Sequence, residues 1–316
     1  MPSPTAVPSV AIIDIGSNSI KLMVAARHPN GALLSRKTRT LDARISTGIS
    51  EANPRLAPDA MMRGLGAIRE LLDEASSYKP ARTILVATSA VRDATNGAEF
   101  REKVRAATGH TIRILTGDEE ANLIGRGLTA DPALAALKDF YVFDLGGGSL
   151  ECLAFAGRKM QQAVSLQLGC VRLTEKFLPK PEEPFPAEAA AAVATHVQAT
   201  FTENKFAFNL PAGAVAVGTG GTVTTVRTIL GARNGRQLDA TDPTVTVAQL
   251  QALLAELGAL PLADRKRIPG LPPPRADVFP VALATLIAIA QLGNFSFFRN
   301  SLYNLRWGLA AEALEK

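Results

Sequence analysis

Residues 142–155 read VFDLGGGSLECLAF, which predicts a strand, a tight glycine turn and a second strand. The glycines Gly146, Gly147 and Gly148 let backbone N–H groups turn inward and approach an anion at a distance that a Cβ would block. Asp144 before the turn and Glu151 after it can supply oxygen ligands to Mg²⁺ beside a bound phosphate. The alternative is a hairpin turn that needs glycine only for its backbone.

A second copy of this pattern occurs much earlier in the chain, where residues 13–24 read IDIGSNSIKLMV. The two copies share the spacing of an acid, a glycine and a serine, namely Asp14, Gly16 and Ser19 in the first and Asp144, Gly146 and Ser149 in the second. A repeat separated by such a long stretch indicates two similar domains and not a solenoid of short units. Two phosphate-type turns on duplicated domains therefore predict one anion held in a cleft between them.

Length and composition agree with a folded two-domain protein. The chain has 316 residues, which makes two domains the natural expectation. Apolar residues make up 47% and charged residues 20%, as in globular proteins. The net charge of +5 is consistent with an anionic ligand. No dense Lys/Arg block with interleaved aromatic residues is present, so the sequence does not favour a nucleic acid partner.

The cysteines and the hydrophobic runs indicate in which cellular compartment the protein is expected. Cys152 and Cys170 have neither a metal-binding nor a redox spacing, and we expect both to be core residues in a reducing compartment. The N-terminal stretch lacks the basic flank and long apolar run of a signal peptide. The longest apolar run, residues 278–290, contains Pro280 and is too short to span a bilayer. The expectation is a cytoplasmic protein without a membrane partner.

The hydrophobic periodicity predicts an α/β fold with two mixed sheets. Strands are expected at 10–15, 19–27, 31–40, 83–87, 111–115, 140–145, 149–156, 159–167, 213–217 and 294–298. Helices are expected at 58–78, 97–108, 116–127, 186–205, 221–230, 245–257, 277–292 and 302–315, with a basic, proline-rich loop at 262–275. The first domain should comprise residues 1–130 with the final helix packing back onto it, and the second domain residues 131–301.

Two adjacent acids open the helix expected after Thr116. Thr116 and Glu119 match a capping box, in which the glutamate reaches back to the N–H of the cap residue. Consecutive helical residues point about 100° apart, so Glu119 and Glu120 cannot share one role. Glu120 is therefore available to face the anion site. The alternative is that Glu120 only favours the positive end of the helix dipole.

Seven motifs in order carry a family resemblance: DIGSNS (14–19), TSAVRDATN (88–96), TGDEEANLI (116–124), DLGGGSLE (144–151), LGCVRLTEKF (168–177), GTGGT (218–222) and PGLPPPRADV (269–278). Over essentially its whole length the chain resembles the Ppx/GppA phosphatase family of exopolyphosphatases and guanosine pentaphosphate phosphatases. That family belongs to the clan of actin and sugar kinases. The resemblance thus implies two duplicated, ribonuclease H-like domains with an interdomain cleft.

The resemblance also implies the short form of the family. Long members carry an additional C-terminal helical domain of the HD phosphohydrolase type. This chain stops before that point, and none of its histidines, His28, His110 and His196, stands in a His-Asp pair. It therefore resembles a short, two-domain member.

The family pattern assigns roles residue by residue. The residues that resemble its phosphate cradle are Ser17, Asn18, Ser19, Lys21, Arg92, Gly146, Gly147, Gly148, Ser149 and Arg275. Asp144 and Glu151 match its metal-binding carboxylates, with Asp14 able to reach the metal through water, and Glu120 matches its catalytic glutamate. The glycine turn represented by Gly218, Gly220, Gly221 and Thr222 should line the far side of the cleft.

Each assignment has a purely structural alternative. Arg92 could be a surface arginine paired with Asp93, and Glu151 could face outward from a half-exposed strand. Arg275 competes with the basic run 265–267, which could serve a polyanion equally well. Further alternatives are a solvent-facing Lys21 and a turn at 218–221 that needs glycine only to join a strand to a helix.

The implied activity is processive hydrolysis of the terminal phosphate of inorganic polyphosphate by an activated water, assisted by Mg²⁺ or another hard divalent cation. One alternative is removal of the 5′-terminal phosphate of guanosine pentaphosphate, a nucleotide of the stringent response. Another is a non-catalytic sensor of polyphosphate or guanosine tetraphosphate, although the carboxylates at 120, 144 and 151 favour catalysis. A sugar or acetate kinase would need an acceptor-binding insert that the sequence lacks. A homodimer would agree with the resemblance.

Overall fold

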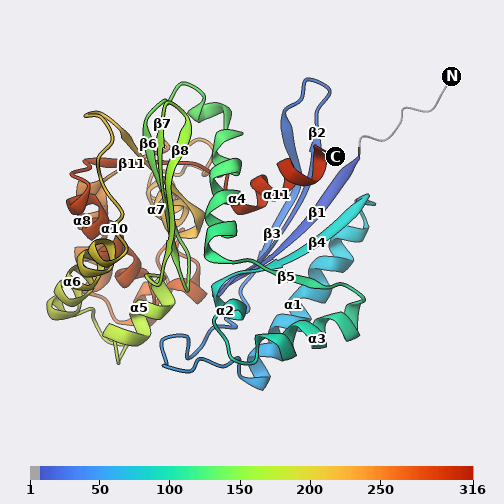
Figure 1. Cartoon of the computed structure of the whole chain (residues 1–316). Coiled ribbons are helices and arrows are strands. Elements are labelled where there is room, and N and C mark those ends of the chain that lie inside the picture. The colour runs from blue at the N-terminus through green and yellow to red at the C-terminus, as the bar shows by residue number, and fades with distance from the viewer. Residues whose placement is uncertain (1–7, 316) are drawn as a thin grey trace. The chain divides into compact units, whose positions relative to one another are not determined.

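The computed structural model describes residues 8–315 and divides the chain into two units. The first consists of the described parts of Met1–Leu134 and Tyr303–Lys316, and the second of Ala135–Leu302. Each unit is built on its own mixed sheet with helices packed against it (Figure 1). The predicted α/β class with two mixed sheets is confirmed.

The first unit has a five-stranded sheet in the order β3-β2-β1-β4-β5. Its strands are β1 (Ser9–Ile15), β2 (Ile20–Arg27), β3 (Leu33–Leu41), β4 (Arg82–Ala87) and β5 (Ile112–Ile114). The first three strands are antiparallel, and β4 and β5 continue in parallel from β1. Every residue of β1 is buried, as expected for a central strand with helices on both faces of its sheet.

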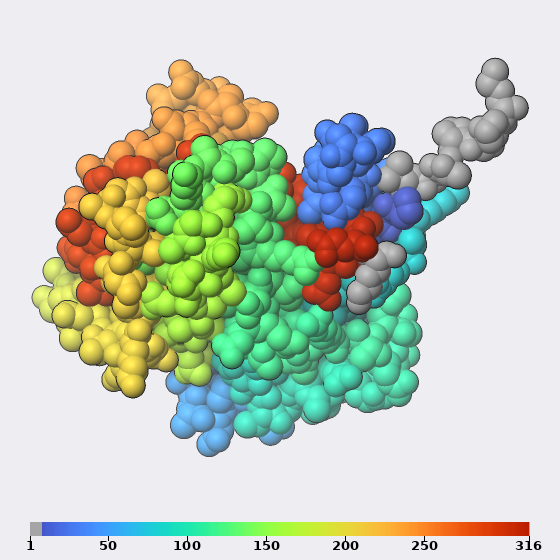
Figure 2. Space-filling view, turned by 45° about the horizontal axis from the view of Figure 1, so that its top comes forward, coloured from blue at the N-terminus to red at the C-terminus, as the bar shows by residue number. Residues whose placement is uncertain are grey.

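The helices of this unit are α1 (Pro58–Ser76), α2 (Ser89–Arg92), α3 (Gly97–Thr108), α4 (Gly117–Thr129), the short η1 (Pro132–Leu134) and α11 (Leu305–Leu314). α11 comes from the far end of the chain and packs against α4 and β1 (Figure 1). A Cβ on Gly127 would lie 2.2 Å from the carbonyl oxygen of Asn304, and one on Gly308 would lie 1.9 Å from that of Leu123. Glycine at both positions therefore lets the two helices approach closely. Part of the surface of α11 remains accessible beside the β2–β3 hairpin (Figure 2).

The second unit repeats the opening of the first and extends it. Its six-stranded sheet has the order β10-β11-β9-β6-β7-β8. The strands are β6 (Phe140–Leu145), β7 (Leu150–Ala156), β8 (Lys159–Leu166), β9 (Val215–Thr219), β10 (Thr244–Thr246) and β11 (Phe297–Asn300). β6, β7 and β8 are antiparallel, and β9 lies parallel to β6, as β4 does to β1.

The helices of the second unit are α5 (Cys170–Phe177), α6 (Ala187–Glu203), α7 (Gly220–Arg233), α8 (Val247–Gly258), α9 (Leu262–Arg265), η2 (Pro273–Arg275) and α10 (Phe279–Leu292). α10 is buried almost throughout and packs against α5, α6 and α8 (Figure 1). Among residues 8–315, no helix combines the length and the apolar character of a membrane span.

Several predicted elements need correction. The expected helix 245–257 begins later because Thr246 caps it, and β10 precedes it. The expected loop 262–275 contains the helical turns α9 and η2. The strand expected at 294–298 begins only at Phe297. The short helices α2 and α5 were not predicted, because their few residues give too little periodicity to detect.

Candidate functional site

The two predicted turns have the same backbone geometry. In the first unit the amide of Gly16 donates to the carbonyl oxygen of Ser19 at 3.2 Å, and in the second the amide of Gly146 donates to that of Ser149 at 3.0 Å. Each turn joins two antiparallel strands, β1 to β2 and β6 to β7. The sequence repeat therefore corresponds to one copy of the same strand–turn–strand structure in each unit.

The glycine turn of the second unit is fixed through its carbonyl groups. Helix α5 begins with Cys170 and Val171. Their amides donate to the carbonyl oxygens of Gly146 and Gly147 at 2.9 and 2.8 Å, respectively. Within residues 8–315, the amides of Gly147 and Gly148 have no hydrogen-bond acceptor. Successive backbone N–H groups held in this way form a concave anion-binding site.

The turn of the first unit is supported by side chains. Ser17 Oγ lies 3.0 Å from Ser89 Oγ, and Asn18 Oδ1 accepts from Arg44 Nε at 3.0 Å. Both Ser17 and Asn18 are buried, while Ser19 is half-buried. In the described part of the chain the amides of residues 17 and 18 also lack acceptors. Each turn thus offers two amides to an anion.

Asp144 and Glu151 stand directly opposite each other in the antiparallel register of β6 and β7. Opposed residues project from the same face with Cβ atoms about 4.5–5.5 Å apart. Glu151 is only 2% exposed, and its Oε1 accepts from Ser165 Oγ at 2.8 Å. The alternative that Glu151 faces outward is therefore wrong.

This acid pair fits the coordination chemistry of Mg²⁺. No group of three or more His, Cys, Asp or Glu residues gathers as a metal site within residues 8–315. Mg²⁺ does not need such a cage, because it is usually bound by one or two carboxylates together with waters and phosphate oxygens. Asp144 and Glu151, next to the amides of the glycine turn, are residues that could supply the protein part of that set.

The turn between β9 and α7 accommodates both an acid and an arginine. A Cβ on Gly220, whose φ is +78°, would lie 2.0 Å from Asp144 Oδ1. A Cβ on Gly221 would lie 1.9 Å from Arg275 Nη1. Arg275 Nη2 also lies 3.5 Å from Thr222 Oγ1, and Gly218 just upstream is buried at the end of β9. Glycine is thus required here for close packing, which a turn with only a backbone role would not need.

Arg265 is the first residue of the basic run that the sequence offers as an alternative to Arg275 for binding a polyanion. The structure excludes Arg265 from that role. Its side chain is 0% exposed, and burial lowers the pKa of its guanidinium. Nη1 donates to the carbonyl oxygen of Ala276 at 3.2 Å, and Nη2 donates to that of Glu183 at 2.9 Å. Arg265 therefore secures the residue that follows Arg275 and cannot itself meet a polyanion.

The two adjacent acids of α4 have separate partners. Thr116 Oγ1 accepts from the amide of Glu119 at 3.1 Å, and Glu119 Oε2 accepts from the amide of Thr116 at 2.8 Å, so the predicted capping box is confirmed. Arg113, 2.8 Å from Glu119, lowers the pKa of that carboxyl group. Glu120 is 6% exposed and lies 2.9 Å from Arg92 Nη1.

Arg92 has several partners in the first unit. Its Nη1 also donates to the carbonyl oxygen of Leu115 at 3.1 Å, and its Nε lies 3.4 Å from Asp93 Oδ1. The expected ion pair with Asp93 is present, but Arg92 is half-buried and not a surface residue. The structure thus brings together Arg92 and Glu120, which the sequence had assigned to different roles.

Asp14 has a partner that the sequence did not suggest. Arg306 Nη1 donates to Asp14 Oδ2 at 3.1 Å, and Lys21 stands opposite Asp14 in the register of β1 and β2. Lys21 is half-buried, so it is not the fully solvent-facing residue of the alternative. Arg306 was missed because it lies in no recognised motif, although the final helix was expected to pack back.

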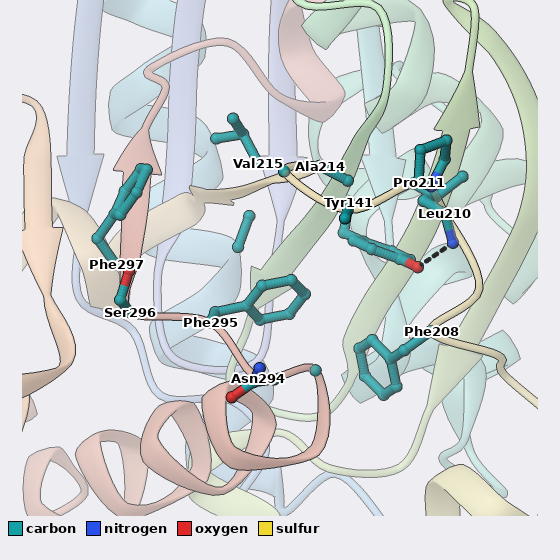
Figure 3. Close-up of a pocket in the computed structure, with 14 residues that line it drawn as sticks. Tyr141, Phe208, Leu210, Pro211, Ala214, Val215, Asn294, Phe295, Ser296 and Phe297 are labelled. Atoms are coloured by element: carbon teal, nitrogen blue, oxygen red, sulfur yellow. Dashed lines mark hydrogen bonds between the residues drawn. The ribbon is translucent and has the colours of Figure 1, made fainter.

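A pocket of about 340 Å³ in the second unit lies away from these residues (Figure 3). It opens at the starts of β6, β9 and β11, whereas Asp144 and Thr219 lie at the ends of their strands. Aromatic rings of Tyr141, Phe208 and Phe295 line it, and none of its lining residues is charged. The Tyr141 hydroxyl accepts from the amide of Leu210 at 2.7 Å. This pocket is unsuited to a phosphate chain.

The cysteines do not contribute a nucleophile. Cys152 and Cys170 are both free and buried, as predicted. Burial raises the pKa of the Cys152 thiol well above its ordinary value. The reactive thiolate is therefore disfavoured at neutral pH.

The sequence pattern of the Ppx/GppA phosphatase family matches residues 11–316. The chain belongs to this family. A guanosine-5′-triphosphate,3′-diphosphate pyrophosphatase from Aliivibrio fischeri is 30% identical over 312 residues, and one from Vibrio vulnificus is 28% identical over 309 residues. Each alignment covers 98% of this chain and 60% of the relative. This Ppx/GppA chain thus spans about 60% of the length of the curated relatives it matches.

Solved structures agree with the family assignment. A Ppx/GppA enzyme from Aquifex aeolicus is 25% identical with a TM-score of 0.77, and the match covers 97% of this chain and 99% of the other. An exopolyphosphatase from Cytophaga hutchinsonii has a TM-score of 0.87 at 20% identity, with coverage of 97% and 98%, and shows the common fold.

Proposed function

We propose that the protein hydrolyses phosphoanhydride bonds and releases the terminal phosphate of inorganic polyphosphate processively. Membership of a phosphatase family supports the reaction class. The observation that carries the proposal is the pair of the half-buried Asp144 and the buried Glu151 beside a turn whose Gly147 and Gly148 amides have no acceptor within residues 8–315. Such a combination suits a metal-bound phosphate better than a neutral ligand.

The residues divide the work by their chemistry. Amides and hydroxyls of the turns at Ser17–Ser19 and Gly146–Ser149 donate to phosphate oxygens, and the guanidinium of Arg275 adds positive charge. Asp144 and Glu151 would hold Mg²⁺ or another hard divalent cation, which neutralises phosphate charge when bound. Glu120 accepts a proton from the attacking water.

A second substrate is favoured by the named relatives. Two of them are called guanosine-5′-triphosphate,3′-diphosphate pyrophosphatases, so guanosine pentaphosphate is the alternative substrate. Action on it would place the protein in the stringent response. A sensor that binds these anions without turnover is the third possibility, and the retained carboxylates at 120, 144 and 151 argue against it. Cytoplasmic location and a homodimer belong to the same proposal.

Phosphate release separates these functions. The wild type is incubated with long polyphosphate, short polyphosphate and guanosine pentaphosphate, each with Mg²⁺ and with EDTA. We expect Mg²⁺-dependent release from polyphosphate that proceeds without accumulation of chains of intermediate length. Release from guanosine pentaphosphate alone would select the alternative substrate, and binding without release of phosphate would select the sensor.

A further inference from the structure

Arg306 approaches the first turn from a segment distant in sequence. It is the second residue of α11, and its amide donates to the side chain of Asn304, which caps the helix, at 3.2 Å. The close approach of α11 to α4 at Gly127 and Gly308 fixes the start of this helix. The backbone that carries Arg306 is therefore held firmly within the first unit.

The guanidinium of Arg306 forms an ion pair with Asp14 that has little exposure to solvent. Their side chains are 14% and 11% exposed, and Nη1 donates to Oδ2 at 3.1 Å. Removing either partner would leave a charge with little access to water, which is strongly unfavourable. Arg306 Nε is buried and has no acceptor within residues 8–315, so this side chain has donor capacity to spare.

The residue that stands opposite the first-strand aspartate differs in charge between the two units. In the second unit Asp144 stands opposite another acid, Glu151, on the same face of the sheet. In the first unit Asp14 stands opposite Lys21 and is bound by Arg306. Asp14 therefore already has a cationic partner from its own unit. A divalent ion beside Asp14 would also be repelled by the guanidinium and the ammonium group.

We propose that Arg306 is a positioning residue that holds Asp14 at the end of β1 and withholds its carboxylate from the divalent cation. The metal is then bound by Asp144 and Glu151 without Asp14. Through this ion pair Arg306 fixes the start of the turn at Gly16–Ser19, which binds phosphate. The inference rests on the proposed function for the meaning of that turn, and it replaces the expectation that Asp14 reaches the metal through water.

Direct metal binding tests the inference without reference to turnover. Mn²⁺ affinity is measured by electron paramagnetic resonance for the wild type, Asp14→Asn, Arg306→Gln and Asp144→Asn. We expect Asp144→Asn to raise the Mn²⁺ dissociation constant by about tenfold or more and Asp14→Asn to change it by less than about twofold, whereas Arg306→Gln, which frees the Asp14 carboxylate, should not raise it. An Asp14→Asn variant that loses Mn²⁺ affinity as Asp144→Asn does would overturn the proposal.

Turnover tests the positioning role. Asp14→Asn and Arg306→Gln should each lower phosphate release from polyphosphate by about 10²-fold, because a displaced turn misplaces the phosphate. The double variant should be no worse than the poorer single variant, since both break one interaction. Arg306→Lys should recover part of the activity. Fully additive losses, or normal turnover in Arg306→Gln, would contradict the role.

A matched control variant and a second set of variants distinguish a specific effect of the Arg306–Asp14 pair from a general loss of stability. Arg126→Gln removes a different ion pair, between α4 and Glu315 at the end of α11, and should leave metal affinity and turnover unchanged. If Arg306→Gln does not fold, Arg306→Lys and Asp14→Asn decide between the outcomes. If the wild type releases no phosphate from any substrate, the proposed function fails, while the Mn²⁺ series still decides whether Asp14 is a ligand.

Discussion

Arg92 Nη1 lies 2.9 Å from Glu120 Oε2, so the arginine expected to bind phosphate and the acid expected to act as base form an ion pair. The Glu120 side chain is 8% exposed and that of Arg92 22%, so solvent screens the pair only partly. An arriving phosphate would compete with the carboxylate for the guanidinium. Substrate binding would then release Glu120 for proton transfer, which connects the two assignments.

Glu120→Gln should retain the fold and polyphosphate binding but reduce turnover by roughly 10²–10⁴-fold, because the amide cannot accept the proton of the attacking water. Phosphate release and thermal unfolding measure the two effects. Glu119→Gln is the matched control, since glutamine also serves in a capping box and should cost little activity. Near wild-type turnover in Glu120→Gln would move the search for the base to Glu151.

Arg92→Ala should weaken polyphosphate binding, since it removes a half-buried positive charge. Raising the salt concentration should weaken binding by the wild type as well, because exposed charges are screened over about 10 Å at 0.1 M. Isothermal titration with short-chain polyphosphate at several salt concentrations measures both. Affinity that is independent of salt, together with a silent Arg92→Ala, would show that charge does not govern recognition.

Gly220→Ala should lower metal-dependent turnover, because its Cβ would lie 2.0 Å from Asp144 Oδ1 and displace that carboxylate. Gly213→Ala is the matched control for backbone strain. Gly213 also has a positive φ, +91°, but a Cβ there meets nothing within 4 Å. Both variants should lose about 1–2 kcal/mol of unfolding free energy from the left-handed conformation. Only Gly220→Ala should raise the Mg²⁺ concentration needed for turnover. If both variants need the same Mg²⁺ concentration, Asp144 is not a metal ligand.

Cys152 should resist alkylation by iodoacetamide in the native protein at neutral pH, since burial raises its pKa well above the ordinary value and blocks access. Mass spectrometry after timed labelling, with denatured protein as the positive control, measures this. Cys152→Ser should leave catalysis intact apart from any loss of stability. Rapid labelling together with loss of activity would reopen the case for a catalytic thiol.

The sequence predicted the parts of the site that lie in local patterns. Both turns, the acid that ends each first strand and the capping box at Thr116 follow from spacing alone, because turn and cap geometry are set by neighbouring residues. The partners of these groups were not predictable in the same way. Arg306 reaches Asp14 through tertiary packing of α11, and no local rule connects positions so far apart in the chain.

Burial separated the arginines that sequence could not distinguish. Arg265 and Arg275 lie in one basic, proline-rich stretch and have the same chemistry. Only the fold shows that Arg265 binds backbone carbonyls in the interior while Arg275 lies against Gly221. Similarly, the pairing of Arg92 with Glu120 requires the position of α4 relative to α2, which hydrophobic periodicity does not provide.

The placement of α11 has a consequence for synthesis on the ribosome. The segment that forms the second unit, Ala135–Leu302, is translated before α11, although α11 belongs to the first unit. The first unit therefore leaves the exit tunnel with the apolar surfaces of β1 and α4 that α11 covers still uncovered. The second unit has all its residues earlier and can fold while the first waits for its last helix. During that interval a nascent chain would present the surface that holdase chaperones bind.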